Sequence, residues 1–556
     1  MARTRNETIR ELTDDYLDNL DMDNLPSPAD IEADLLEQIT IAIMNYNSCA
    51  NKDTKWRVPT TLLPSQVAAI MLKIYPIKCI ACAGNNADSS YDLLSIYQEH
   101  GPNEGIYVTN EQIFNNIARQ YNYAITSREL SEIINILRDN APRTTRCADP
   151  DLIAVNNGIF NYKTKQLEDF DKDKVFITKS RIDYNPAATN VVIHNDTDNT
   201  DWDIESWMND LSDDPEIVDT LWQIIGAIIR PHVHWNKSAW LYSSTGNNGK
   251  GTLCELMRNL CGEGSYASIP LSDFSKDFML ENLTRASAII VDENSVGEFI
   301  DKVANLKAII TNDVIQINRK FKTPIAYQFY GFMVQCLNEM PRIKDKSDSF
   351  YRRQIFIPFD KCFTGAERKY IKYDYLQRTD VLEYVLYKVL HMNYYDISEP
   401  STCKNALNEY KEFNDPIRQF IDEIFPELKW DLLPFSFLYD LYKAWAKQNS
   451  PNGSIQGKNT FITDLLKLLP ALLPDWYSPG RQSAIKPANK MSVAEPLIDQ
   501  YNLTDWKNKG YNGYDIDKMC RPTLKATYNG IIRRTPSTNT KPDTTNAFND
   551  NDKTDK

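Results

Sequence analysis

A ten-residue segment rich in glycine and asparagine constrains this chain more than any other feature. It reads Ser243-Ser-Thr-Gly-Asn-Asn-Gly-Lys-Gly-Thr252 and lies between an apolar run, Ala239–Tyr242, and a run with helical periodicity, Leu253–Leu260. A strand, a turn of small residues and a lysine at a helix start suit a phosphate group, because backbone N–H groups face the anion and the lysine reaches its oxygens. The segment predicts a nucleotide site in an α/β domain; the alternative is a Gly/Asn-rich turn.

The residues expected to contact the nucleotide run through the loop into the helix. They are Ser244, Thr245, Gly246, Asn247, Asn248, Gly249, Lys250, Gly251 and Thr252. Two of them depart from the usual pattern. Ser244 stands where a glycine is usual, and Gly251 stands where a Mg²⁺-binding hydroxyl is usual. Thr252 is then the nearest hydroxyl for the metal.

A second apolar run ends in two carboxylates. It reads Ala288-Ile-Ile-Val-Asp-Glu293. In a nucleotide site of this kind, Asp292 would hold Mg²⁺ and Glu293 would polarise the attacking water. Many strands end in acidic residues without such a role, but the combination with the loop predicts a nucleoside triphosphatase.

Three further features follow within the same region. Asn338 ends an apolar strand and could sense the terminal phosphate, although most such asparagines are turn caps. A predicted hairpin presents Arg319, Lys320, Phe321 and Lys322, which suit a DNA backbone with one stacked base; the alternative is a solvated tip. Arg352 and Arg353 open another strand, where one could complete a neighbouring subunit's site or form a surface ion pair. We prefer Arg353.

The order of these motifs resembles superfamily 3 helicases of the AAA+ class, in the poxvirus and phage/plasmid primase-helicase branch. That branch has a similar Asn-Gly-Lys-Gly-Thr loop and Phe-x-Arg-Arg segment. The resemblance covers residues of about 90–425 and includes Asp151–Asn161, Ile182–Ala187 and Asn414–Phe420. It implies hexameric rings that use ATP and Mg²⁺ and move 3′ to 5′ on single-stranded DNA. Because it starts near residue 90, we expect a helicase-only form without the polymerising domain.

The chain is long enough for several domains, and we expect five segments. These are an acidic disordered leader (1–29), a mixed helicase-associated or oligomerisation domain (30–200), the AAA+ motor (201–425), a small mostly helical, winged-helix-like domain (426–534) and a disordered tail (535–556). Within the second segment, helices are predicted at Ser65–Ile74, Glu111–Tyr121 and Arg128–Asn140. The leader could instead bind a protein or imitate DNA.

Charge and composition limit the kinds of partner and the location that we expect for this protein. The net charge is −14, but residues 476–534 carry ten basic and five acidic side chains, which favours origin duplex DNA as a partner of the C-terminal domain; a charged oligomerisation surface is the alternative. No apolar run is long enough for a membrane span and no secretory signal is present, so we expect a cytoplasmic protein in a bacterial host. Cys79 and Cys82 have metal-site spacing, but isolated pairs of this kind are mostly buried thiols.

The sequence therefore predicts a ring-forming replicative helicase of a phage or mobile element, acting on single-stranded and forked DNA. One alternative is an origin-binding initiator whose ATPase switches assembly without processive unwinding. Another is a remodelling ATPase that acts on protein, which the basic hairpin disfavours.

Overall fold

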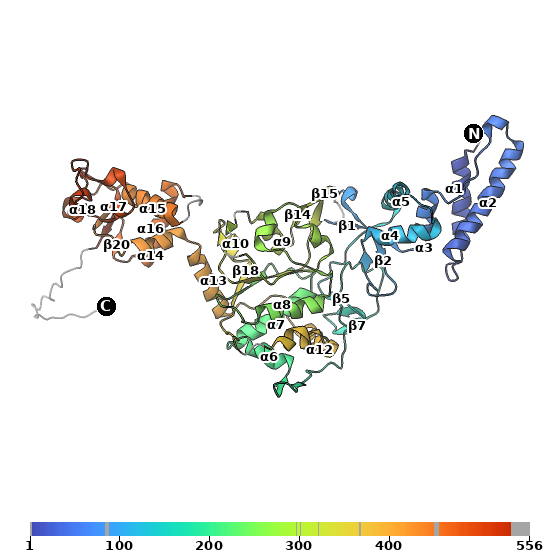
Figure 1. Ribbon diagram of the computed structural model, residues 1–556, viewed down its shortest axis with the longest axis horizontal. Helices are drawn as coiled ribbons and strands as arrows, with labels where there is room; N and C mark the ends of the chain where they lie inside the picture. The colour runs from blue at the N-terminus through green and yellow to red at the C-terminus, as the bar shows by residue number, and fades with distance from the viewer. Residues whose placement is uncertain are drawn as a thin grey trace, which may run out of the picture. The chain divides into compact units, whose positions relative to one another are not determined.

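The computed structural model describes residues 3–534 except 84–87, 296, 298, 301, 321, 366–367 and 450–454. It divides into two compact units, Met1–Tyr410 and Lys411–Lys556 (Figure 1). The tail predicted at 535–556 lies outside the described residues. In the described part of the chain, no helix is both long enough and apolar enough to cross a membrane.

The first segment is folded, so the prediction of a disordered leader over 1–29 is wrong. Helix α1 covers Arg5–Asp18 and begins at a capping box of Thr4 and Glu7. Helix α2 covers Pro28–Cys49 and packs against it. The acidic composition conceals the reason: apolar residues recur every four positions, and the buried face of α2 consists of Ile31, Leu35, Ile39 and Ile43.

A buried polar contact joins α1 to the rest of its unit. Gln66 lies in α3 (Pro64–Ile74), and its Nε2 donates a 2.9 Å hydrogen bond to the Thr13 hydroxyl of α1. That hydroxyl in turn donates to the Ile9 carbonyl, while Gln66 Oε1 accepts from the Leu63 N–H. These bonds satisfy the polar atoms inside the protein, so α1 is docked and not merely helical.

The helices predicted near residues 65, 111 and 128 are confirmed as α3, α4 (Glu111–Tyr121) and α5 (Ser127–Asn140). They pack beside a four-stranded sheet of order β3-β2-β1-β4. Its strands are β1 (Ile77–Ala81), β2 (Leu93–Tyr97), β3 (Tyr107–Val108) and β4 (Arg143–Thr145). The 3-10 turns η1 (Lys52–Thr54) and η2 (Ser89–Tyr91) complete this part.

Cys79 lies in the middle of β1 and Cys82 just beyond its end, and both are buried thiols, as the sequence favours. Their sulfur atoms contact different backbone carbonyls, those of Arg138 and Tyr91. Burial raises the pKa of each thiol to about 11.

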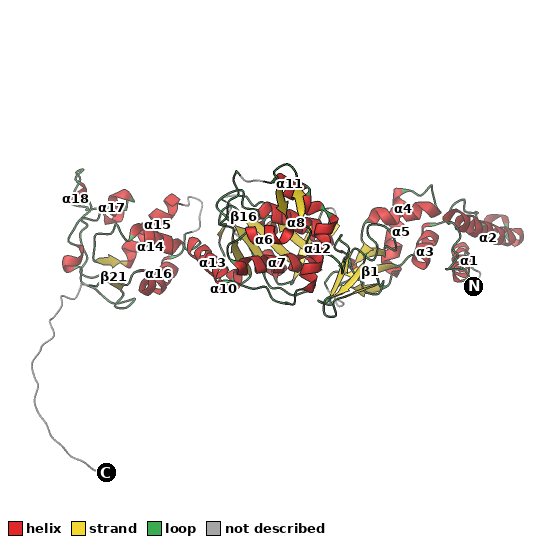
Figure 2. Ribbon diagram, turned by 90° about the horizontal axis from the view of Figure 1, so that it is seen from below, coloured by secondary structure: helices red, strands yellow, loops and turns green. Residues whose placement is uncertain are grey.

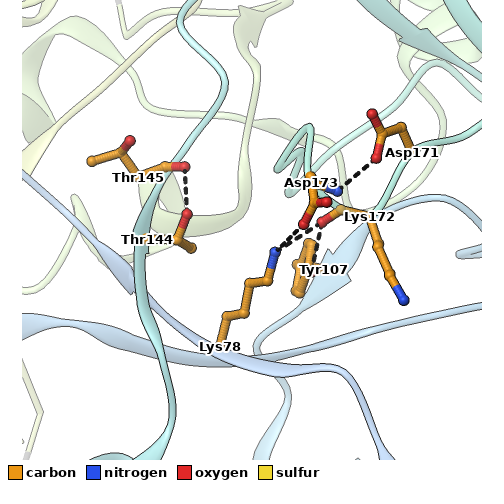
Figure 3. Close-up of polar contacts among 7 residues, drawn as sticks. All are labelled: Lys78, Tyr107, Thr144, Thr145, Asp171, Lys172 and Asp173. Carbon is orange, nitrogen blue, oxygen red and sulfur yellow. Dashed lines mark hydrogen bonds and ion pairs between the residues drawn. The ribbon is translucent and has the colours of Figure 1, made fainter.

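A loop near residue 172 covers one side of this sheet. The Lys78 ammonium donates to the Lys172 carbonyl and to the Asp173 carboxylate, each at 3.1 Å (Figure 3). The Tyr107 hydroxyl donates to the same carbonyl at 2.8 Å. Two strands of the sheet therefore hold one backbone oxygen, which ties the sheet to the following segment. That segment contains β5 (Leu152–Val155), β6 (Gly158–Asn161), β7 (Gln166–Glu168), β8 (Ile193–Asn195) and β9 (Thr200–Trp202).

The predicted parallel sheet is confirmed, and its spatial order is β11-β12-β16-β10-β18. The strands are β10 (Ser238–Tyr242), β11 (Tyr266–Ala267), β12 (Ala288–Val291), β16 (Phe332–Leu337) and β18 (Gln354–Pro358). Their carboxyl ends meet at one edge, where ligands bind in sheets of this type.

Helices cover one face of this sheet and aromatic rings the other. Ala239 and Leu241 of β10 belong to a core with α7 (Pro215–Ile229), α8 (Lys250–Cys261) and α12 (Thr379–His391). These three helices lie together in both views (Figures 1 and 2). On the opposite face the Trp240 ring contacts those of Phe350 and Tyr410. Further elements of this region are α6 (Ile204–Asp210), η3 (Leu271–Ser275), η4 (Glu281–Arg285), β13 (Phe299–Ile300), α9 (Ala304–Ile310), β17 (Arg342–Ile343), α10 (Asp348–Tyr351), α11 (Lys369–Tyr373), η5 (Tyr375–Gln377) and α13 (Ser401–Phe413).

The predicted hairpin is formed by β14 (Val314–Arg319) and β15 (Lys322–Gln328), which pair antiparallel. Its base is tied to the N-terminal sheet. The Gln328 N–H donates to the Cys82 carbonyl at 3.0 Å, and the Arg146 guanidinium donates to the Tyr327 hydroxyl at 2.9 Å. The second strand is therefore held at its base by residues from the end of β1 and from just beyond β4.

The second unit begins before the predicted boundary at 425. Helix α14 (Pro416–Ile424) belongs to its core, because Ile417, Phe420, Ile421 and Ile424 are buried there. Helices α15 (Phe435–Asn449) and α16 (Lys458–Leu472) follow α14 in the chain. An antiparallel sheet of order β19-β21-β20 completes this core. The remaining elements are β19 (Leu432–Pro434), β20 (Trp476–Tyr477), η6 (Ala488–Met491), α17 (Leu497–Gln500), η7 (Thr504–Trp506), α18 (Ile516–Met519) and β21 (Gly530–Arg533).

Docking of α1 can be tested by Thr13→Val. This change leaves Gln66 Nε2 without its hydrogen-bond partner in the core. The free energy needed to open α1 should therefore fall by about 1–3 kcal/mol. Hydrogen exchange of the α1 amides measures this free energy. Thr8→Val is the control, because Thr8 also donates to the carbonyl four residues earlier but no side-chain bond to it is seen. Equal effects of the two changes would contradict the docking role.

Candidate nucleotide-binding site

The loop after β10 lies at the carboxyl edge of the sheet. The Ser243 N–H donates to the Leu337 carbonyl of β16 at 3.1 Å, which fixes the start of the loop. Farther along, the Phe363 N–H donates to the Asn247 carbonyl at 2.7 Å. Ser244, Thr245, Gly246 and Asn247 are exposed between these anchors. The loop is therefore held from both sides while its outer residues face solvent.

Two glycines allow close packing where the loop enters α8. Gly249 is the N-cap of α8 and has a φ of 87°, and a Cβ there would lie 2.6 Å from Leu211 Cδ2. A Cβ at Gly251 would lie 2.7 Å from Asp292 Oδ1. A side chain at position 251 would therefore require the carboxylate of Asp292, which directly follows β12, to move.

Lys250 is buried at the first position of α8. Its side chain is 5% exposed, and its Nζ has no hydrogen-bond partner. Burial lowers the pKa of this ammonium, and the charge of Asp292 opposes the shift only in part. The helix N-terminus also lacks a side-chain cap. An unpartnered cation beside uncapped helix N–H groups is a site prepared for an anion.

Asp292 follows β12 and faces both the loop and a second lysine. Its carboxylate lies against Gly251, and its Oδ2 lies 3.9 Å from the Nζ of Lys372 in α11. Half-buried Thr252 follows Gly251, and Glu293 is exposed beyond Asp292. The structure thus places Lys250, Gly251 and Asp292 together, whereas the sequence contains no signal for Lys372.

The segment after Asp292 is anchored by a residue that sequence reasoning missed. Buried Asn294 donates to Gln335 Oε1 at 3.0 Å and to the Cys336 carbonyl at 2.9 Å, and it accepts from the Leu271 N–H. These bonds hold the end of β12 against β16. Asn338, which directly follows β16, is exposed at the same edge of the sheet.

A pair of cysteines lies beneath this site. Cys254 of α8 and Cys336 of β16 bring their sulfur atoms within 3.3 Å. The hydrogen bond with Cys254, and then burial, raise the pKa of the Cys336 thiol well above its usual value. The two residues are far apart in the sequence, so no local pattern predicts the pair.

The two arginines lie at the opposite edge of the sheet. Arg353 directly precedes β18, and its carbonyl accepts a 2.7 Å hydrogen bond from the Ser238 N–H at the start of β10. Its guanidinium donates to the Ser349 backbone carbonyl and, at 2.9 Å, to the Ser349 hydroxyl, whereas Arg352 is exposed. Arg353, the preferred residue from the sequence, thus has its guanidinium bound to Ser349 of its own chain, and Arg352 is the more exposed of the two.

The basic hairpin residues are only partly described. Arg319 is half-buried and Lys320 is exposed near the tip, where the strand pairing is irregular between Ile317 and Arg319. Phe321 lies outside the described residues, and Lys322 is described only as the start of β15.

Three family models match separate parts of the chain. Residues 85–213 match a model described as D5 N terminal like, and residues 412–508 match one described as Poxvirus D5 protein-like. In the sequence, these D5-like segments lie on either side of the candidate nucleotide loop. The loop itself lies within residues 241–353, which match a family of unknown function (DUF5906). The D5-like segments agree with the poxvirus side of the resemblance seen in the sequence.

Among solved structures, the chain is similar to the NrS-1 C-terminal region. An A form apo structure is 12% identical, with a TM-score of 0.39, covering 84% of this chain and 99% of that one. Another apo structure is 11% identical, with a TM-score of 0.38, covering 76% and 97%. At these scores the likeness supports no conclusion about this chain. No curated protein sequence matches it.

The burial of Lys250 predicts an unusual effect on stability. Lys250→Met removes a buried ammonium without a hydrogen-bond partner and keeps most of the side-chain volume. The free energy of unfolding of the first unit, without nucleotide, should rise by about 0.5–2 kcal/mol. Denaturant unfolding of the full chain measures it. Lys172→Met is the control, because that side chain is exposed, and it should change little. A fall in stability for Lys250→Met would contradict an unpaired charge.

Proposed function

We propose that this chain is a replication-associated, ATP-dependent DNA helicase of superfamily 3, with an AAA+ motor that forms rings, by expectation hexamers. The observation that carries the proposal is the unpartnered, buried Nζ of Lys250 at the uncapped N-terminus of α8. The D5-like segments support the choice of this family over other nucleoside triphosphatases.

The residues around the loop fit ATP with Mg²⁺. Lys250 would neutralise the terminal phosphates, and the N–H groups at the start of α8 would donate to them. Asp292 and Thr252 would hold Mg²⁺, which when bound spreads the charge of the phosphate oxygens. Lys372 now lies beside Asp292, so it would have to share or yield this carboxylate.

Two exposed residues at the sheet edge suit the hydrolysis itself. Glu293 is placed to accept a proton from the attacking water, and Asn338 can donate to the terminal phosphate from the strand between β10 and β12. Asn338 directly follows this intervening strand, and its position supports the AAA+ proposal. One edge of the sheet then presents the loop, the asparagine that would sense the terminal phosphate, and the carboxylates of Asp292 and Glu293 together.

The position of Arg352 supports catalysis shared between subunits. It precedes the five-residue strand β18, whose other end pairs with Tyr242 beside the phosphate loop. At about 3.3 Å for each strand residue, roughly 16 Å separates the two edges. Arg352 therefore lies far from its own loop, and its exposed side chain would be placed to reach a neighbouring subunit in a ring.

DNA contacts are proposed at two places. The hairpin cations Arg319 and Lys320 would bind the backbone of single-stranded or forked DNA, with translocation 3′ to 5′. In the second unit, the helices α14 to α16 with the sheet β19-β21-β20 would form a winged-helix-like module for origin duplex DNA. Its basic residues beside aromatic rings support this assignment, such as Arg533 over Trp476 at 4.8 Å.

Mixing two inactive variants tests the motor. Arg352→Ala should bind ATP but hydrolyse it about 10³-fold more slowly, because the transition-state charge loses its cation. Lys250→Ala should not hydrolyse ATP. Mixed rings would contain interfaces with an intact loop and an intact arginine, so part of the ATPase activity should return.

Arg353→Ala is the matched control for this experiment, since its guanidinium is bound to Ser349 of its own chain. It should lose less activity than Arg352→Ala. If activity does not return on mixing although subunits exchange, the arginine is not supplied by a neighbour. If Lys250→Ala retains ATPase activity, the assignment of the nucleotide site to this loop is wrong.

The DNA-binding role of the hairpin is tested by changing Arg319 and Lys320 to Ala together. The slope of log affinity against log salt for single-stranded DNA should become shallower by about 0.7 for each phosphate that no longer binds a cation of the protein. Lys172→Ala is an exposed control away from the hairpin. An unchanged slope would reject the hairpin as the DNA-binding element. Wild-type protein that hydrolyses ATP and binds duplex but opens no fork would favour the alternative, an origin-binding initiator.

A further inference from the structure

The cysteine pair beneath the nucleotide site forms a group of metal ligands with Asp292. Cys254 lies one helical turn after Lys250, and Cys336 is 1% exposed in the central strand β16. One ligand atom from each cysteine and one from Asp292 lie within 4.8 Å of one another. Among the residues that the structure describes, no other group of three such ligands comes this close.

The spacing of the sulfur atoms fits a shared cation better than a disulfide. Two thiolates on a tetrahedral zinc ion, each about 2.3 Å from it, lie roughly 3.8 Å apart. The observed 3.3 Å between the sulfur atoms is about 0.5 Å short of this. A disulfide needs about 2.05 Å, a closure of roughly 1.3 Å across the contact between α8 and β16.

The three ligands lie at different depths, which gives a cation a path from the surface to the sulfur atoms. The Asp292 side chain is 34% exposed, whereas Cys254 is fully buried beneath it. A cation would meet the carboxylate first and then the two sulfur atoms. Cys254, Cys336 and Cys261 all lie in the same apolar core, but only the first two belong to a ligand group with a carboxylate.

Most of the charge in the site would be compensated. Two thiolates and one carboxylate carry three negative charges, a divalent cation with the Lys250 ammonium supplies three positive ones, and Lys372, 3.9 Å from Asp292, adds a fourth at the exposed side. Charges of one sign in a buried site are costly unless they are compensated. The unpartnered Nζ of Lys250, whose nearest acidic groups include both cysteines and Asp292, supplies this compensation.

We propose that Cys254, Cys336 and Asp292 bind a thiophilic divalent cation of the zinc class, with a fourth position open to water. Each thiol releases its proton on ligation. The effect on hydrolysis rests on the proposed function, because Asp292 is also the proposed Mg²⁺ ligand. Two divalent cations at one carboxylate repel each other, so the thiophilic cation and magnesium nucleotide weaken each other's binding, by the same factor.

Cobalt(II) tests the site directly, because thiolate ligation produces a sulfur-to-cobalt charge-transfer band. Reduced, chelator-treated full-length protein should bind one Co²⁺ with this band. Cys254→Ser and Cys336→Ser should each weaken binding by at least about 100-fold. Cys261→Ser, a buried thiol in the same helix, should retain it. Absence of the band in the wild type, or equal loss in Cys261→Ser, would overturn the proposal.

Competition between Co²⁺ and magnesium nucleotide can be measured in the wild-type protein, so this test does not depend on the folding of a variant. A non-hydrolysable ATP analogue with Mg²⁺ should raise the Co²⁺ concentration needed for half-saturation; an unchanged titration would reject a shared Asp292. Zn²⁺ should inhibit the ATPase of the wild type, and the Cys254→Ser/Cys336→Ser protein should resist inhibition.

The outcomes separate this proposal from the proposed function. A cobalt band in a protein without ATPase activity leaves the metal site standing and rejects the motor. ATPase activity without a cobalt band leaves the motor standing and rejects the metal site. Loss of both thiols in air without any metal would show a disulfide in place of the cation site.

Discussion

The parallel pairing of β10 with both β16 and β18 determines the rest of the arrangement. In this register Tyr242 lies beside Leu337 and Pro358, so the phosphate loop and Asn338 emerge at one edge. The same register places Arg352 at the other edge. Backbone hydrogen bonds in the sheet therefore separate the parts that would act within one subunit from the part that would act on its neighbour.

Much of this arrangement could be predicted because its signals are local. Apolar runs of four to six residues became the central strands, and residues with helical spacing became α3, α4 and α5. The loop between β10 and α8 could be located because a single segment contains the glycines, the lysine and the helix start. The folded leader was missed because its buried residues, such as Ile9 and Leu17, are diluted by acidic neighbours that favour disorder.

The remaining features depend on contacts between distant parts of the chain. Nothing near Lys372 indicates that it lies beside Asp292, and nothing near Cys254 indicates Cys336. The choice between Arg352 and Arg353 depended on which guanidinium the Ser349 turn would hold. Such contacts follow from the three-dimensional arrangement of strands and helices, which the spacing along one sequence does not specify.

The missing side chain at Gly251 has a consequence for how this site can change over time. The Asp292 carboxylate fills the space that a Cβ would need, so a serine or threonine at position 251 requires the carboxylate to move at the same time. Substitutions at two touching positions are not additive. The two residues are therefore coupled: the cost of a side chain at position 251 depends on where the carboxylate at position 292 can move.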